Sequence, residues 1–237
     1  MDYIDYKSAG IKASTMESLI EFKEAHKPHD IPETTIWSHG LSAVNTKTSA
    51  SSHLEGVQEI LGTGREISCG KYGDEKSHGE FKWRACLGPV GLYIQGHCSL
   101  MSCDDMGSVS IDGKRYPRNF EAQFVETIEE LNSSAYNEAL IAPEKIIGGW
   151  VRKDILDDMV SATADTYYNG YDAEMRQLLF EEELVPKRDN LLECIAAMEP
   201  AGIPIEYICF INGLRPVIFS SQNKKVREGI TFLYLFF

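Results

Sequence analysis

The chain has 237 residues, of which 43% are hydrophobic and 25% charged, and its formal net charge is −13. This balance excludes the weakly hydrophobic, highly charged composition of disordered chains, and the length suits one large domain or one domain with an appendage. An acidic surface repels phosphate backbones and no Lys/Arg stripe offsets it, so nucleic acid is not expected as a partner.

The sequence carries no signal for a membrane. Its first residues lack a basic region followed by an apolar run, and no stretch approaches the ~18 apolar residues of a membrane span. The six cysteines are dispersed without CxxC spacing, which predicts free thiols in a reducing compartment. We therefore expect a soluble cytoplasmic protein. Delivery into a host cell by a specialised secretion system is compatible with this, because such addresses need not resemble signal peptides.

The first third of the chain predicts two helices around a short strand. Capping-box spacing of Ser14 and Glu17 precedes an apolar helical pattern over about residues 15–25. Residues 34–37 are β-branched and aromatic, which predicts a strand that delivers residues 38–40 to a loop. A second capping box, Ser52 with Glu55, predicts a helix that ends at the glycines of segment 62–64.

The middle of the chain reads mainly as strands. Residues 90–94 and 98–101 are predicted as separate strands parted by glycine, and Asp112-Gly113 predicts a hairpin between residues 108–111 and 114–116. The helical spacing of Phe120, Phe124, Ile128 and Leu131 predicts an amphipathic helix. Residues 136–141 and 145–151 are predicted as two strands, because a proline between them cannot extend a central ladder.

After Arg152 the apolar spacing becomes helical, with Pro186 and Pro200 as expected helix boundaries. Strands are expected again over 203–211 and 216–219, and the apolar segment 230–237 is expected as a buried strand. The predicted fold class is α+β: a mixed or antiparallel β domain with flanking helices over residues 1–151, followed by a mainly helical subdomain over residues 152–237.

Three short motifs stand in a fixed order along the predicted β domain. His39-Gly40-Leu41-Ser42 follows the first strand, a helix with a glycine exit comes next, and Tyr136-Asn137-Glu138 lies on a strand before Pro143. This order resembles that of the ADP-ribosyltransferases over about residues 34–151, in which ADP-ribose passes from NAD to a protein acceptor, and the resemblance extends to bacterial toxins and secreted effectors of this type.

The resemblance implies a role for each matching residue. Glu138 would be catalytic, because a preorganised carboxylate stabilises the positive charge that develops as nicotinamide leaves. His39 would hold NAD through a ribose hydroxyl, and Tyr72 would stack on nicotinamide; the motif residues Gly40, Ser42 and Tyr136 complete the implied NAD site.

Two departures leave the subclass open. The interval from His39 to Ile60 is longer than the family's usual spacing from the His-Gly motif to the helix, and no clear Ser-Thr-Ser strand appears. Arg65 could instead be the basic anchor of the arginine-type subclass.

Other functional interpretations stay open beside this one. His97 and Cys98, with Cys103, His78 and Cys86, could bind zinc or form a cysteine-dependent hydrolase, although adjacent strand residues point to opposite faces. The acidic pairs 104–105 and 157–158 could hold a divalent ion, but they lack EF-hand spacing and are typical of solvated turns and helix faces. We therefore expect no metal site.

A non-catalytic function is also compatible with the sequence. The helical part after Arg152 and the apolar segment 230–237 could form a docking surface, which would make the protein an adaptor or effector that binds a partner. Helical apolar faces more often serve internal packing.

Overall fold

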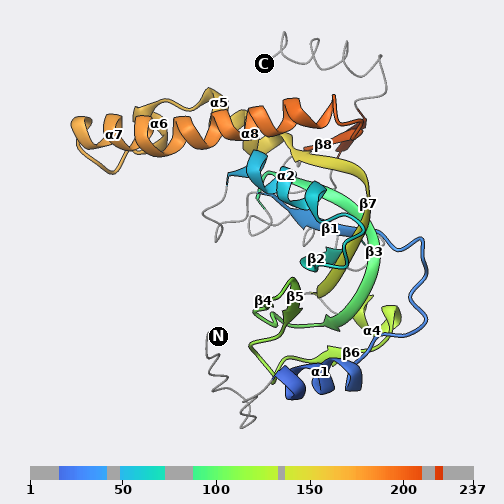
Figure 1. Cartoon of the computed structure of the whole chain (residues 1–237). Coiled ribbons are helices and arrows are strands. Elements are labelled where there is room, and N and C mark those ends of the chain that lie inside the picture. Colours follow the sequence, from blue (N-terminus) through green and yellow to red (C-terminus); the bar gives the residue numbers. More distant parts are fainter. Residues whose placement is uncertain (1–15, 42–48, 73–87, 133–136, 210–216, 221–237) are drawn as a thin grey trace. The chain divides into compact units, whose positions relative to one another are not determined.

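The computed structural model describes residues 16–41, 49–72, 88–132, 137–209 and 217–220, the last of these by backbone only. It has an α+β fold, as predicted (Figure 1). The chain divides into two compact units: the first comprises 1–39, 57–82 and 93–146, and the second comprises 40–56, 83–92 and 147–237. The last segment of the second unit begins close to the predicted boundary, but this unit also takes in two earlier pieces of the chain.

Five strands pair within the first unit. Their hydrogen-bonded order is β6-β3-β1-β2-β7, with an additional β3–β7 pairing. Strand β2 is antiparallel to both of its neighbours: Ser38 lies opposite Gly70, and Ser68 lies opposite Leu140. The bounds are β1 Trp37–Gly40, β2 Ile67–Lys71, β3 Val90–Ser102, β6 Phe124–Val125 and β7 Glu138–Arg152. Central β2 therefore joins the segments that carry His39 and Glu138.

Strands β3 and β7 are both continuous where the sequence predicted interruptions. A Cβ atom at Gly96 would stand 2.2 Å from the Ala142 carbonyl oxygen and 2.9 Å from the Pro143 Cα atom. Glycine is thus the residue that permits this close approach of backbones, rather than a strand break. Pro143 stays within β7, and its carbonyl accepts a hydrogen bond from the Gly62 amide at 2.9 Å.

The prediction that residues 38–40 form a loop is wrong, because they belong to β1. Likewise, the predicted amphipathic helix from Phe120 is confirmed only for its last turn, α4 Ile128–Asn132. Phe124 pairs with Ser102 in the β6–β3 ladder, and the Gln123 amide donates to the Asp104 carboxylate at 3.0 Å. Strand pairing therefore outweighed the helical spacing of the phenylalanines.

The predicted first helix and hairpin are confirmed. Helix α1 spans Met16–Ala25, and strands β4 Val109–Ile111 and β5 Lys114–Tyr116 flank the predicted turn. Both turn residues have positive φ, 50° at Asp112 and 80° at Gly113, as this hairpin type requires. Phe22 of α1 packs against a buried cluster of the first unit that includes Leu100, Met106 and Leu140.

Helix α2 spans Ala50–Glu59 and begins before the predicted capping box. The Ser49 hydroxyl accepts the Ser52 amide at 3.3 Å, so Ser49 rather than Ser52 occupies the capping position. The predicted glycine exit is confirmed, since Gly62 and Gly64 have positive φ of 70° and 77°.

The second unit contains most of the helical residues. Its helices are α5 Lys153–Ser161, α6 Ala164–Tyr167, α7 Ala173–Leu179 and α8 Val185–Met198, drawn in yellow to orange in Figure 1. Pro186 marks a helix boundary, as predicted: it lies in the first turn of α8, directly after the π-helical turn η3 Phe180–Leu184. Proline is tolerated in a first turn, and the wider π-turn accommodates its missing N–H donor.

Two short strands complete the second unit, close to the predicted ranges. Strand β8 Ile205–Cys209 is parallel to the end of β7, and β9 Val217–Ser220 is antiparallel to β8. Within the described part of the chain, no helix is long and apolar enough to cross a bilayer. The predicted strand at 230–237 lies outside the described residues.

Candidate functional site

Three neighbouring strands of the first unit connect two of the sequence-predicted residues, His39 and Glu138, through Ser68. The His39 ring nitrogen Nδ1 lies 2.6 Å from the Ser68 carbonyl oxygen, and the Ser68 hydroxyl donates to Glu138 Oε1 at 2.6 Å. Ser68 and Glu138 share one face of the sheet, because Ser68 lies opposite Leu140 and side chains alternate along β7. By the same alternation Ser38, which lies opposite Gly70, shares this face, so the His39 side chain projects from the other face of the sheet. His39 therefore contacts the main-chain carbonyl of Ser68, whereas Glu138 contacts the Ser68 side chain.

The Glu138 carboxylate is almost fully enclosed. The residue is 7% exposed, and its Oε2 atom accepts the Met106 amide at 2.8 Å. Burial raises the pKa of Glu138 and Asp105 adds to this effect, while the two hydrogen bonds and the Arg115 guanidinium oppose it. A carboxylate whose proton affinity is raised in a preorganised polar setting is a candidate for chemistry as well as for structure.

The other residues of the predicted NAD site have mixed placements. Tyr72 is half-buried, follows β2 directly, and contacts Tyr93 edge to face with ring centroids 4.9 Å apart. Gly40 ends β1 and is buried. Ser42 and Tyr136 lie outside the described residues. The alternative anchor Arg65 is exposed and packs on the hairpin turn, where a Cβ at Gly113 would meet its Cγ at 2.8 Å.

Sequence reasoning missed Ser68, Met106 and Arg115 as neighbours of Glu138. The alternation of Glu66 and Ser68 along β2 was an available signal, because residues two apart on a strand share a face. No comparable signal existed for the Met106 amide, which comes from an irregular segment after β3.

A second buried carboxylate, Glu66, lies just before β2. Lys23 Nζ of α1 donates to both Glu66 oxygens, at 3.0 and 2.9 Å, and to the Arg115 carbonyl at 3.0 Å. The Arg115 amide also donates to Glu66 Oε2 at 2.6 Å. The Lys23 and Glu66 side chains are only 12% and 2% exposed, so this ion pair is buried.

Burial acts against both charges of this pair. It lowers the pKa of Lys23, although the attraction of Glu66 opposes that effect. For Glu66 burial alone would raise the pKa, but the hydrogen bonds from Arg115 and Lys23 outweigh it and the pKa is lowered. Three acceptors around Lys23 Nζ match the three donors of an ammonium, so we treat the pair as ionised at neutral pH.

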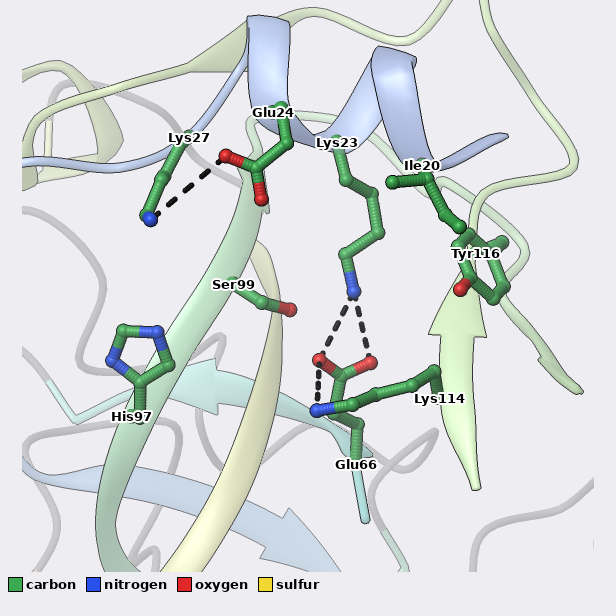
Figure 2. A pocket seen from close by; sticks show the side chains of 9 residues that line it. All are labelled: Ile20, Lys23, Glu24, Lys27, Glu66, His97, Ser99, Lys114 and Tyr116. Atoms are coloured by element: carbon green, nitrogen blue, oxygen red, sulfur yellow. Dashed lines mark hydrogen bonds and ion pairs between the residues drawn. The ribbon is translucent and has the colours of Figure 1, made fainter. Parts of the chain in front are cut away.

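This pair forms the floor of a pocket of about 220 Å³. Figure 2 shows Lys23 and Glu66 joined at its centre, with side chains from α1, β3 and β5 around them. Glu138 is not among the residues that line this pocket. The first unit thus holds a closed carboxylate site at Glu138 and an open pocket over Glu66.

The described cysteines are poor candidates for a nucleophile. Cys69, Cys98, Cys103 and Cys194 are free and buried. Burial raises the pKa of Cys98 and of Cys194 to about 12, and that of Cys69 well above its usual range, so these thiols stay protonated at neutral pH. His97 is exposed beside buried Cys98, as expected for adjacent strand residues.

The metal-binding alternatives find no support in the described residues, where no group of three or more His, Cys, Asp or Glu side chains could hold an ion. Asp104 and Asp105 accept main-chain amides of Gln123 and Gly107 instead. Asp157 pairs with Lys153 on α5. His78 and Cys86 lie outside the described residues.

Comparison with known proteins adds no relative. No family model matches the chain, and the searches of curated proteins and of solved structures returned no match. The geometry of the site is therefore the only basis for inferring a function.

Proposed function

We propose that the protein is a mono-ADP-ribosyltransferase that moves ADP-ribose from NAD to a protein acceptor, with Glu138 as the catalytic carboxylate. The observation that carries the proposal is the hydrogen bond of 2.6 Å between the Ser68 hydroxyl and Glu138 Oε1, while His39 Nδ1 lies 2.6 Å from the Ser68 carbonyl oxygen. In support of the proposal, motifs almost a hundred residues apart in sequence lie on strands β1 and β7, with β2 between them.

The proposed chemistry uses the charge of Glu138. When the bond between nicotinamide and ribose breaks, nicotinamide takes the electron pair and positive charge develops on the ribose. An ionised carboxylate held by Ser68 stabilises that charge and accepts a hydrogen bond from a ribose hydroxyl, and a nucleophile of the acceptor protein then forms the new bond. In the acidic limb activity rises with pH, because the pKa of Glu138 is raised and its ionised form is required.

The enclosure of Glu138 sets a condition on this mechanism. The Met106 amide occupies Oε2, and Met106 is itself fully buried beside Leu100 and Leu140. A ribose hydroxyl can reach Oε2 only if the Met106 segment withdraws, which gives up packing contacts. The Tyr72 ring, which contacts Tyr93 in this structure, would likewise turn to stack on nicotinamide.

The substitution Glu138→Gln tests the proposal. The purified chain should hydrolyse NAD or label proteins of a cell extract with ADP-ribose, and the variant should lose that activity while it keeps a folded thermal transition. Glu144→Gln is the matched control, because Glu144 is an exposed glutamate of the same strand. A Glu138→Gln variant that retains activity would refute the site assignment, and an inactive wild-type chain would remove the proposal.

A second candidate function, binding of a partner protein without catalysis, is favoured by the surface of the helical unit. Among the described residues, six of the eight exposed large apolar side chains belong to segment 153–198. They include Tyr167 and Tyr171, which are 50% and 55% exposed. Residues 153–209 also carry thirteen Asp and Glu against four Lys and Arg, so a basic partner with apolar side chains would fit.

A co-purification experiment distinguishes the two candidate functions. If the helical unit is the functional part, a specific protein should co-purify with wild-type chain and be lost with Tyr167→Ser and Tyr171→Ser, while Glu138→Gln leaves the association intact. If the chain is instead an ADP-ribosyltransferase, as a host-directed effector or as a cytoplasmic enzyme, the surface of segment 153–198 would bind its acceptor protein. NAD turnover would then accompany binding.

A further inference from the structure

The pocket over the Lys23–Glu66 pair brings two lysines and a histidine ring together from three elements of the first unit. Helix α1 contributes Lys27, strand β3 contributes His97, and strand β5 contributes Lys114. In Figure 2, Lys27 and His97 lie on one side of the pocket and Lys114 on the other, with Ser99 between them. This convergence contrasts with the formal net charge of −13 of the whole chain.

The floor of the pocket carries little net charge. The Glu66 carboxylate is compensated by the Lys23 ammonium and by the Arg115 amide. An approaching anion therefore meets a neutralised ion pair rather than a bare carboxylate. The Ser99 hydroxyl is also part of the lining and can turn toward a ligand.

The rim residues keep donors that can turn to a ligand. Lys27 and Lys114 are 56% and 52% exposed. Lys114 Nζ donates to the Gly64 carbonyl at 2.8 Å and lies 3.8 Å from Glu66 Oε1, and an ammonium has a further N–H group to offer. Lys27 lies 3.9 Å from Glu24 with both side chains exposed, and surface pairs of this kind are weak enough to exchange for a ligand.

Size and charge together define the ligand class. A volume of about 220 Å³ is below that of pockets for drug-sized ligands, so a whole dinucleotide does not fit inside. A phosphate group has three acceptor oxygens and nearly two negative charges, which matches two lysine ammonium groups and an imidazole that approach from three elements. We propose that this pocket binds a small phosphate-bearing molecule through Lys27, His97 and Lys114.

The proposal is tested on the full wild-type chain with two probes, inorganic phosphate and ribose 5-phosphate, at constant ionic strength. Titration followed by amide chemical shifts should give saturable changes at Gly64, Ser99 and Lys114, whereas neutral ribose should give none. Lys27→Met and Lys114→Met should each weaken binding about fivefold to tenfold, the effect of losing one charge-assisted contact.

Lys145→Met is the matched control, since Lys145 is an exposed lysine of the same unit that does not line the pocket. Retained affinity in this variant, with loss in the two rim variants, supports the proposal. Equal losses in all three variants would show non-specific attraction and would overturn it, as would shifts that never saturate. Tighter binding to vesicles that contain phosphatidic acid than to ribose 5-phosphate would reassign the pocket to a membrane surface and also overturn it. Each outcome is independent of NAD turnover.

Discussion

The two buried carboxylates of the first unit have opposite surroundings. Glu66 accepts the Arg115 amide and, in addition, pairs directly with the Lys23 ammonium, and its pKa is lowered. Glu138 accepts hydrogen bonds from a hydroxyl and an amide, and its pKa is raised. Burial penalises the charge in both places, so the difference lies in what compensates it. A carboxylate with a cation partner is fixed in its charged state, whereas one held by neutral donors keeps a proton affinity that chemistry can use.

The largest expected effect comes from breaking the Lys23–Glu66 pair. Lys23→Met removes the ammonium that hydrogen-bonds both Glu66 oxygens, and Glu66→Leu leaves the buried Lys23 ammonium without its carboxylate. Either change should lower the free energy of unfolding by about 3–5 kcal/mol. The double variant should recover a large part of this loss, because it leaves neither charge. Urea denaturation of the four proteins measures the coupling. Additive losses in the double variant would mean that the pair does not act as a unit.

The next effect is expected at the other carboxylate. Ser68→Ala removes the hydroxyl donor of Glu138 Oε1 and should cost about 1–3 kcal/mol, because a buried acceptor loses its hydrogen bond. It should also raise the pKa of Glu138 further and reduce any NAD turnover. Ser110→Ala, at an exposed serine of β4, serves as the control and should change stability by less than about 0.5 kcal/mol. Equal effects at both serines would deny Ser68 a special role.

A smaller effect should appear in the pH dependence of stability. The folded state raises the pKa of Glu138 above its ordinary value of 4.5, so it binds more protons than the unfolded state as pH rises through this range. The stability of the wild-type chain relative to Glu138→Gln should therefore fall from about pH 4 upwards and level off above the folded pKa. Thermal unfolding of both proteins across that pH range measures the difference in stability between them. Titratable groups present in both proteins, such as Glu66, cancel in this difference. A difference that grows with pH would contradict the environment described for Glu138.

The smallest effect is expected for the exposed ion pair at the rim of the pocket. Glu24→Gln should change the free energy of unfolding by less than about 0.5 kcal/mol, because Glu24 and Lys27 are 68% and 56% exposed. The loss in the free energy of unfolding can then be compared with that of Glu66→Leu, which breaks a buried ion pair of the same pocket. A loss at Glu24 as large as that at Glu66 would show that burial is not the deciding variable.

Much of the local structure followed from the sequence. The α1 helix, the hairpin turn at Asp112 and the β8 strand were predicted from capping, turn chemistry and apolar spacing. The errors arose where long-range pairing outweighed local signals. Gly96 and Pro143 are local strand breakers, yet they lie within continuous strands because the two backbones approach each other there.

The site was less predictable than the fold. His39 and Glu138 were chosen from motif order, and their connection through Ser68 required a register that periodicity alone does not specify. The pocket was not predicted, because its lysines come from α1 and β5, segments whose proximity depends on packing of Phe22 and Tyr116 against shared neighbours such as Phe120. Charge patterning along one element gave no indication of it.

The connection through Ser68 has a consequence for the order of folding. The two contacts at Ser68 close loops of 29 and 70 residues. Closing these loops costs conformational entropy of the chain before the contacts can stabilise the fold. Local elements such as the β4–β5 hairpin can form early, but the Glu138 environment exists only after three distant segments have paired. A nascent or partly folded chain therefore lacks this carboxylate environment, and any activity that depends on it is confined to molecules that have completed the β1-β2-β7 assembly.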